Sequence, residues 1–152
     1  MDPRDLEPSH AMPDFQTIAY VSSAARLLSE AELETLLVTA RDLNSQNSVT
    51  GVLLYGSGIF MQCFEGPPSA VHETYERIRA SHQHTDIIEL LNERLDVRSF
   101  ADWQMGFSQV TRSELLTLSH AHWARLNAEV RGTSPTPSGL ALLQNFWKHA
   151  RK

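Results

Sequence analysis

The stretch VTGVLLYGSGIFMQCFEG, residues 49–66, contains two apolar segments that are separated by the sequence Gly-Ser-Gly at 56–58. Apolar runs that flank a short glycine-rich break are typical of a β-hairpin, so we expect two adjacent antiparallel strands here. The second strand is apolar on both faces: Phe60 and Phe64 alternate with Ile59, Met61 and Cys63. A sheet that contains such a strand needs a covering layer on each side.

The residues around this hairpin predict two helices and three further strands. One helix begins after Ser29, which forms a capping box with Glu32 and precedes leucines at helical spacing. The other begins at the Pro-Pro pair 67–68 and ends near Ser81. The expected strands cover residues 15–22, 85–97 and 102–110. The order βαββαββ predicts an α+β fold, a ferredoxin-like sandwich with one extra strand.

The C-terminal part of the chain predicts two more helices. They lie near 112–128, with Leu115, Leu118 and Trp123, and at 138–150, with Leu140, Leu143, Phe146 and Trp147. We expect them to cover the far face of the sheet or to pack on a second subunit. The run RGTSPTPSG at 131–139 is typical of a linker. The predicted organisation is a disordered leader over 1–13, a domain over 14–110 and a helical extension over 111–152.

Composition and charge exclude several classes of protein. The chain has 152 residues, of which 41% are hydrophobic, and a formal net charge of −5. This is the wrong sign for a protein that binds nucleic acid through its phosphates. No apolar run reaches the length of about 20 residues that spans a bilayer. The single cysteine, Cys63, excludes an internal disulfide, and the N-terminal residues lack a secretory pattern. We therefore predict a cytoplasmic protein that binds neither nucleic acid nor membrane.

Three polar residues fall on faces that should be apolar. Gln62 lies between Phe60 and Phe64 in the alternation of its strand, and a buried amide without partners costs about 1–3 kcal/mol. Asn44 follows Leu33 by about three helical turns and so shares its inward face. Tyr20 lies on the inward face of the first strand. A buried Asn or Tyr is most often structural, but Gln62 has no obvious structural role and indicates a specified partner, which adjacent strands would make Tyr20.

In this pattern the chain resembles the BLUF domains, which are flavin-binding blue-light sensors. The resemblance covers about residues 15–110. The matching residues are Tyr20-Val21-Ser22, Asn44, Val49 to Tyr55, Phe60-Met61-Gln62 with Glu65-Gly66, Tyr75 to Ile78, and Arg98 to Phe107.

The resemblance implies that a flavin ring inserts between the two helices with its edge against Tyr20 and Gln62. Tyr20 would donate an electron and a proton to the photoexcited ring, and Gln62 would relay the proton and then change its tautomer or orientation. Asn44 would bind the polar edge of the ring and Ile78 would pack on its face. Ser22 and His84 would complete the cofactor site. Trp103 and Met105, two apart in the last predicted strand and therefore on one face, would pass the change to the C-terminal helices.

The chain departs from the family at two positions. Many members have an Arg-His pair near the flavin's tail where this chain has Gln83-His84, so both FAD and FMN stay open as the cofactor. Many also have a second polar residue where this chain has Leu43, which implies one contact fewer at the ring.

The resemblance further implies a receptor without a catalytic output domain. Its output would be a light-dependent contact with a separate, unidentified protein, and self-association through the last helices is also expected.

The alternative is a small ferredoxin-like enzyme, such as an acylphosphatase-like hydrolase. That activity needs a cradle of backbone amides and an arginine between the first strand and its helix. The stretch SSAARLLS at 22–29 has Arg26 but no glycine. No histidine, cysteine and carboxylate set has the spacing of a zinc site, so no metal is expected.

Overall fold

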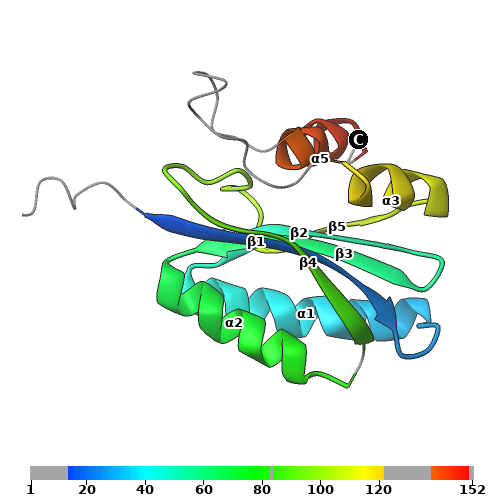
Figure 1. The fold of residues 1–152 in the computed structure, drawn as a ribbon. Helices are drawn as coiled ribbons and strands as arrows, with labels where there is room; N and C mark the ends of the chain where they lie inside the picture. The colour runs from blue at the N-terminus through cyan, green and yellow to red at the C-terminus, as the bar shows by residue number, and fades with distance from the viewer. Residues whose placement is uncertain (1–13, 83, 122–137, 151–152) are drawn as a thin grey trace, which may run out of the picture.

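The structure is a computed structural model that describes residues 14–82, 84–121 and 138–150. A single sheet lies between two helical layers, with α1 and α2 on one face and α3 and α5 on the other (Figure 1). The elements are β1 (Phe15–Ala24), α1 (Glu30–Asn47), β2 (Thr50–Gly56), β3 (Ile59–Gly66), α2 (Pro68–Ala80), β4 (His84–Leu95), β5 (Gly106–Gln109), α3 (Arg112–Ser119) and α5 (Ser138–Ala150).

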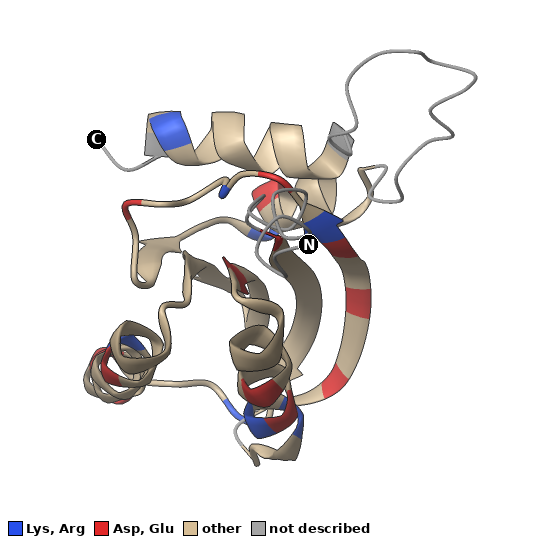
Figure 2. Cartoon of the chain, turned by 90° about the vertical axis from the view of Figure 1, so that its left-hand side faces the viewer, with Lys and Arg blue, Asp and Glu red and all other residues tan. Residues whose placement is uncertain are grey.

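The strand order is β4-β1-β3-β2-β5, in which β5 runs parallel to β2 and the other neighbours are antiparallel. The first four strands have the ferredoxin-like order, and β5 is the extra strand, so the predicted α+β fold is confirmed. Strand β4 forms one edge of the sheet and carries acidic residues along its length (Figure 2), including the exposed Asp86 and Glu89. Charged side chains on an edge strand discourage pairing with another chain.

The local signals explain where the first elements begin and turn. Ser29 Oγ accepts the N–H of Glu32 at 3.1 Å, and Glu32 Oε1 accepts the N–H of Ser29 at 2.8 Å, so the predicted capping box starts α1. In the β2–β3 hairpin, Ser57 and Gly58 have φ of 52° and 77°. Two successive positive φ values match the twist of the flanking strands and fix their register.

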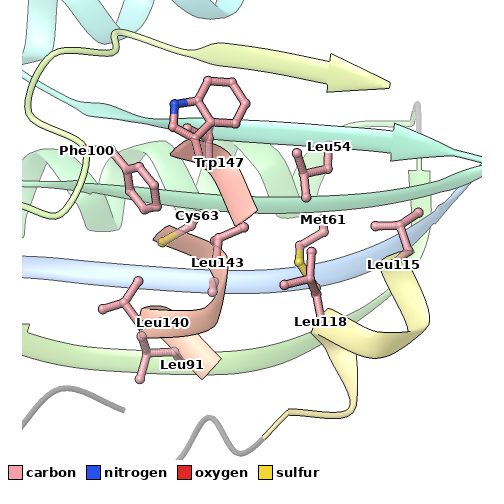
Figure 3. Packing of buried hydrophobic residues seen from close by; sticks show 12 residues of the cluster. Leu54, Met61, Cys63, Leu91, Phe100, Leu115, Leu118, Leu140, Leu143 and Trp147 are labelled. Atoms are coloured by element: carbon pink, nitrogen blue, oxygen red, sulfur yellow. The ribbon is translucent and has the colours of Figure 1, made fainter. Parts of the chain in front are cut away.

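Two hydrophobic clusters lie on opposite faces of the sheet. The far-face cluster joins the sheet to α3 and α5 and is centred on Met61, Cys63, Leu115, Leu118, Leu140, Leu143 and Trp147 (Figure 3). The cavity-side cluster joins the sheet to α1 and α2 and includes Tyr20, Leu33, Phe60, Phe64 and Met105. The expectation that the C-terminal helices cover the second face is thereby confirmed. Trp123, the leader 1–13 and residues 131–137 of the predicted linker lie outside the described residues.

The last predicted strand, 102–110, is wrong at its start, because β5 contains only Gly106–Gln109. The residues before it form turns that are tied to distant strands: Trp103 N–H donates to Phe100 O at 3.1 Å, and Gly51 N–H donates to Trp103 O at 2.7 Å. Strand alternation therefore does not apply to Trp103 and Met105. Met105 belongs to the cavity-side cluster, whereas Trp103 packs against the far-face cluster, so the prediction that they share a face is also wrong.

No helix in the described part of the chain is long and apolar enough to cross a membrane.

Candidate functional site

A cavity of about 770 Å³ lies between the sheet and the helices α1 and α2. Such a volume is typical of a small-molecule site. Figure 2 shows these two helices side by side on one face of the sheet, with the C-terminal helix on the other. The walls are mostly apolar, with Leu36, Ala40, Leu43, Leu53, Phe60 and Ile78 among the lining residues. Asn44 and Gln62 supply polar groups inside this apolar space.

Tyr20 and Gln62 form the buried polar pair of the cavity. They are direct partners in the register of β1 against β3, and the Tyr20 hydroxyl donates a hydrogen bond to Gln62 Oε1. Their exposed fractions are only 3% and 8%. Burial, and to a lesser degree Tyr75, raises the pKa of Tyr20 above its usual value. The phenol is therefore neutral at physiological pH and can release its proton only to a neighbouring acceptor.

Met105 lies at the other end of the same amide. Gln62 Nε2 donates to Met105 Sδ at 3.6 Å, and both residues line the cavity. A thioether sulfur is a weak acceptor and cannot donate. The amide is thus held firmly at its oxygen and weakly at its nitrogen.

Asn44 and Arg41 tie the segment around Met105 to α1. Asn44 Nδ2 donates to Gln104 O at 2.8 Å, and Arg41 Nε donates to Met105 O at 3.0 Å. Asn44 is 3% exposed, as its helical position predicts. Arg41 was not predicted from the sequence; the available signal was its place one turn before Asn44 on the same helix.

Ser22, Ile78 and His84 form a second polar network beside the cavity. Ser22 Oγ lies 2.7 Å from His84 Nδ1, and His84 Nε2 lies 2.9 Å from Ile78 O. Because a carbonyl can only accept, Nε2 carries the proton, and in the neutral ring Nδ1 accepts from Ser22. Ile78 and His84 line the cavity, whereas Ser22 does not line it and holds the imidazole of His84 through this hydrogen bond.

The structure thus brings six of the eight predicted site residues to the cavity: Tyr20, Asn44, Gln62, Ile78, His84 and Met105. Ser22 and Trp103 do not line it. The ring of Trp103 instead lies edge to face with that of Trp147 in α5, with ring centroids 5.4 Å apart.

Like Arg41, Tyr75 lies beside the site and was not predicted from the sequence to belong to it. Its ring centroid lies 6.2 Å from that of Tyr20, and its hydroxyl donates to Glu89 Oε1 at 3.0 Å. Burial and this hydrogen bond raise the pKa of Tyr75 to about 12. Tyr75 therefore stays protonated and directs its hydroxyl proton to a carboxylate on the solvent side, whereas the hydroxyl proton of Tyr20 points to Gln62.

Basic residues also line the cavity. Arg26, Arg77 and His82 belong to the lining of the cavity. Arg26 is paired with the exposed carboxyl of Glu32. The hydrogen bonds that Glu32 accepts from Arg26 and Ser29 lower its pKa to about 2. The cavity therefore offers apolar walls, two primary amides within and positive charge in its lining. These features fit a planar ring with a polar edge and an anionic tail, which is the chemistry of a flavin nucleotide.

The fold and the site together define a ligand-binding α+β domain in which a buried Tyr–Gln pair faces a cavity for such a ring. The family described as "BLUF: Sensors of blue-light using FAD" matches residues 15–106 of this chain. The chain therefore belongs to the BLUF family, and the protein is a flavin-binding blue-light receptor.

Individual relatives agree with this assignment. The chain is 37% identical over 90 residues to the photoactivated adenylate cyclase subunit beta of Euglena longa, a match that covers 59% of this chain and 10% of the relative. The structure of BlrB, a BLUF protein in its dark state, aligns with a TM-score of 0.60 and 33% identity over 70% of this chain and 80% of that chain. A bacterial light-regulated adenylyl cyclase aligns with a TM-score of 0.59 and 27% identity over 90% of this chain and 35% of that chain.

The chain spans about a tenth of the length of the curated relatives it matches. The match supports a sensor module in this chain. The cyclase activity in the relatives' names is not assigned to it. The alternative of an acylphosphatase-like hydrolase finds no support in these comparisons.

Proposed function

We propose that this receptor signals through a proton-coupled electron transfer from Tyr20 that rearranges the hydrogen bonds of Gln62. When bound, the flavin supplies absorption of blue light and, once excited, an electron acceptor. Tyr20 would give up an electron, and its hydroxyl proton would move along the existing hydrogen bond to Gln62 Oε1, while the amide would pass one of its own N–H protons on to the ring that takes the electron. Because the electron and the proton leave the phenol together and the amide relays a proton onward, neither Tyr20 nor Gln62 would be left as a buried ion in an apolar site.

The observation that carries this proposal is the asymmetric hydrogen bonding of Gln62. Its oxygen accepts from Tyr20, and its Nε2 donates to Met105 Sδ at 3.6 Å. If the amide changes its tautomer or rotates, its acceptor turns toward the sulfur, and two acceptors then face each other. Met105 and the backbone around it must respond, while Gln62 gains no charge.

Other residues of the cavity hold the ring. Asn44 supplies an amide for the polar edge of the ring, and Ile78 supplies an apolar side chain for its face. His84, which is hydrogen-bonded to Ser22, lines the cavity at the start of β4. We infer FAD as the cofactor, with FMN as the alternative, because the family is described as using FAD and because Arg77 in the cavity lining supplies positive charge for a phosphate-bearing tail. Chromatography of the flavin released from purified protein distinguishes the two.

The proposed mechanism is tested with Gln62→Leu. This variant keeps the volume of the side chain but cannot exchange hydrogen bonds, so we expect the small light-induced red shift of the flavin spectrum to disappear while flavin stays bound. Gln46→Leu, an exposed position on α1 outside the cavity, is the matched control and should behave as the wild type. A normal photocycle in Gln62→Leu would disprove the mechanism.

We further propose that the output is a light-dependent contact with another protein in the cytoplasm, and that the chain associates with itself through its C-terminal helices. The match of relatives that are photoactivated cyclases supports an effector partner, and the negative charge of the chain argues against nucleic acid. Light scattering after size exclusion, in the dark and under blue light, measures the self-association. A monomer in both states would exclude it.

A further inference from the structure

The helix α5 contacts residues 98–105, which are part of the segment between β4 and β5, and the first residue of β5. Gln144 Nε2 donates to Ser99 O at 3.4 Å, and the Trp147 ring lies edge to face with Trp103. Residues 144 and 147 are three apart and so lie on one side of the helix. Gly106 makes the contact close: a Cβ atom there would lie 2.4 Å from Trp147 Cζ2.

The same segment contacts the flavin cavity on its other side. Met105 Sδ accepts from Gln62, Met105 O accepts from Arg41, and Gln104 O accepts from Asn44. Trp103 and Met105, two residues apart, therefore point to the two different layers of the molecule. A displacement that begins at Met105 reaches Trp103 through two peptide units.

Trp147 is held by ring packing alone. Its side chain is 4% exposed, and its Nε1 has no hydrogen-bond partner among the described residues. The other buried residues of α5, Leu140 and Leu143, pack on the sheet and extend toward Leu91, away from Trp147 (Figure 3). Because no hydrogen bond fixes the indole, its position follows the surfaces of Trp103 and Gly106.

We propose that Trp147 is the positioning residue through which α5 responds to light: the segment shifts with Met105, and Trp147 carries the shift into the C-terminal helix. This inference rests on the rearrangement of Gln62 proposed above. It adds a residue in α5 that must move for the signal to leave the sensor module.

Hydrogen–deuterium exchange of the α5 peptide 138–150 in the flavin-loaded protein, in the dark and under blue light, measures this response. Exchange reports local opening, so a helix whose packing changes with illumination shows a light-minus-dark difference. The flavin red shift is recorded on the same samples. We expect the wild type to show both the red shift and the exchange difference.

Trp147→Leu should keep the red shift and lose the exchange difference in α5, and Trp147→Phe, which retains a ring, should restore part of it. Leu140→Val is the matched control, because it loosens the same helix without touching Trp103. It should raise α5 exchange in the dark and in the light alike and keep the difference between them. A merely structural role for Trp147 would give the result of this control.

The outcomes separate this inference from the proposed function. A wild type without a red shift contradicts the proposed function. A wild type with the red shift but without any light-dependent exchange in α5 overturns the inference and leaves the proposed function intact. This outcome is measured on the wild type alone, so it does not depend on whether a variant folds. An exchange difference that persists in Trp147→Leu overturns it as well.

Discussion

A glutamine between two phenylalanines of a covered strand is stable only if its amide finds partners. Gln62 finds one through the register of β1 against β3, which sets Tyr20 directly opposite, and the other in Met105. The second partner is a weak acceptor, so the amide is satisfied without being locked. This combination keeps the buried residue compatible with the fold and leaves it free to exchange its hydrogen bonds.

Glu65, three residues further along β3, is a buried carboxyl that holds the segment 98–105. Its exposed fraction is 0%, its Oε2 accepts the N–H of Phe100 at 2.6 Å, and its Oε1 has no partner among the described residues. Burial raises the pKa of Glu65, and the N–H groups of Ser99 and Phe100 and the charge of Arg98 only partly oppose this. The carboxyl therefore binds its proton more tightly in the folded chain than in the unfolded one.

This pKa shift predicts a pH-dependent stability. Below the unfolded pKa of 4.5 the carboxyl is protonated in both states. As the pH rises from there through the folded pKa, the unfolded chain loses the proton first, so the contribution of Glu65 to the free energy of unfolding falls. Glu65→Gln keeps an oxygen for Phe100 and removes the titration. Urea unfolding between pH 4.5 and 8 should show that the free energy of unfolding of the variant increases relative to that of the wild type as the pH rises.

The exposed Glu73→Gln on α2 is the control for this comparison and should follow the wild-type pH profile. A constant difference between Glu65→Gln and the wild type across the pH range would mean that Glu65 does not titrate differently in the folded chain.

At the scale of elements, sequence patterns predict correctly those features that depend on interactions between residues close in sequence. The capping box at Ser29, the hairpin at 56–58 and the inward face of α1 depend on neighbours in sequence, and each lies where it was expected. The start of β5 differs from the prediction because Trp103 O accepts the N–H of Gly51, which lies about a third of the chain away in sequence. The network of Ser22, His84 and Ile78 also escaped prediction as a unit, since only the folded sheet brings its hydrogen bonds together.

The contact between β2 and β3 predicts a large effect of Gly51→Ala. A Cβ atom at this position would lie 2.1 Å from the backbone oxygen of Cys63, which cannot rotate away, so the two strands must separate. We expect a loss of about 1–3 kcal/mol or more in the free energy of unfolding, the range of overpacked cores. Urea denaturation measures it.

Gly58→Ala is the comparison for this prediction. Gly58 has φ of 77°, but a Cβ atom there would make only an ordinary van der Waals contact, with Leu27 Cδ2 at 3.5 Å. This variant carries only the strain of a left-handed residue, about 1–2 kcal/mol. If Gly58→Ala were the more destabilised of the two, close strand packing at Gly51 would not be the limiting contact.

In the whole molecule, the buried apolar residues form two clusters, and one of them surrounds a cavity. The far-face cluster is closed by α3 and α5, whereas the cavity-side cluster surrounds the cavity of about 770 Å³. The single sheet between them gives the two sides a shared scaffold, and β3 contributes to both with alternate residues. Loss of packing on the far face should therefore weaken the fold without changing what the cavity binds.

Flavin binding in the dark tests this separation. A ligand that binds only the folded chain raises the free energy of unfolding by RT ln(1 + [L]/Kd), or about 2.7 kcal/mol at a free concentration of 100 Kd. Leu115→Ala in α3, at a site 1% exposed, should lower the baseline by about 2–5 kcal/mol. The increment produced by a fixed flavin concentration should stay as in the wild type. Asn44→Ala should reduce that increment, because it removes an amide from the cavity. An increment lost in Leu115→Ala and retained in Asn44→Ala would mean that flavin affinity depends on the far-face packing and not on the polar residues of the cavity.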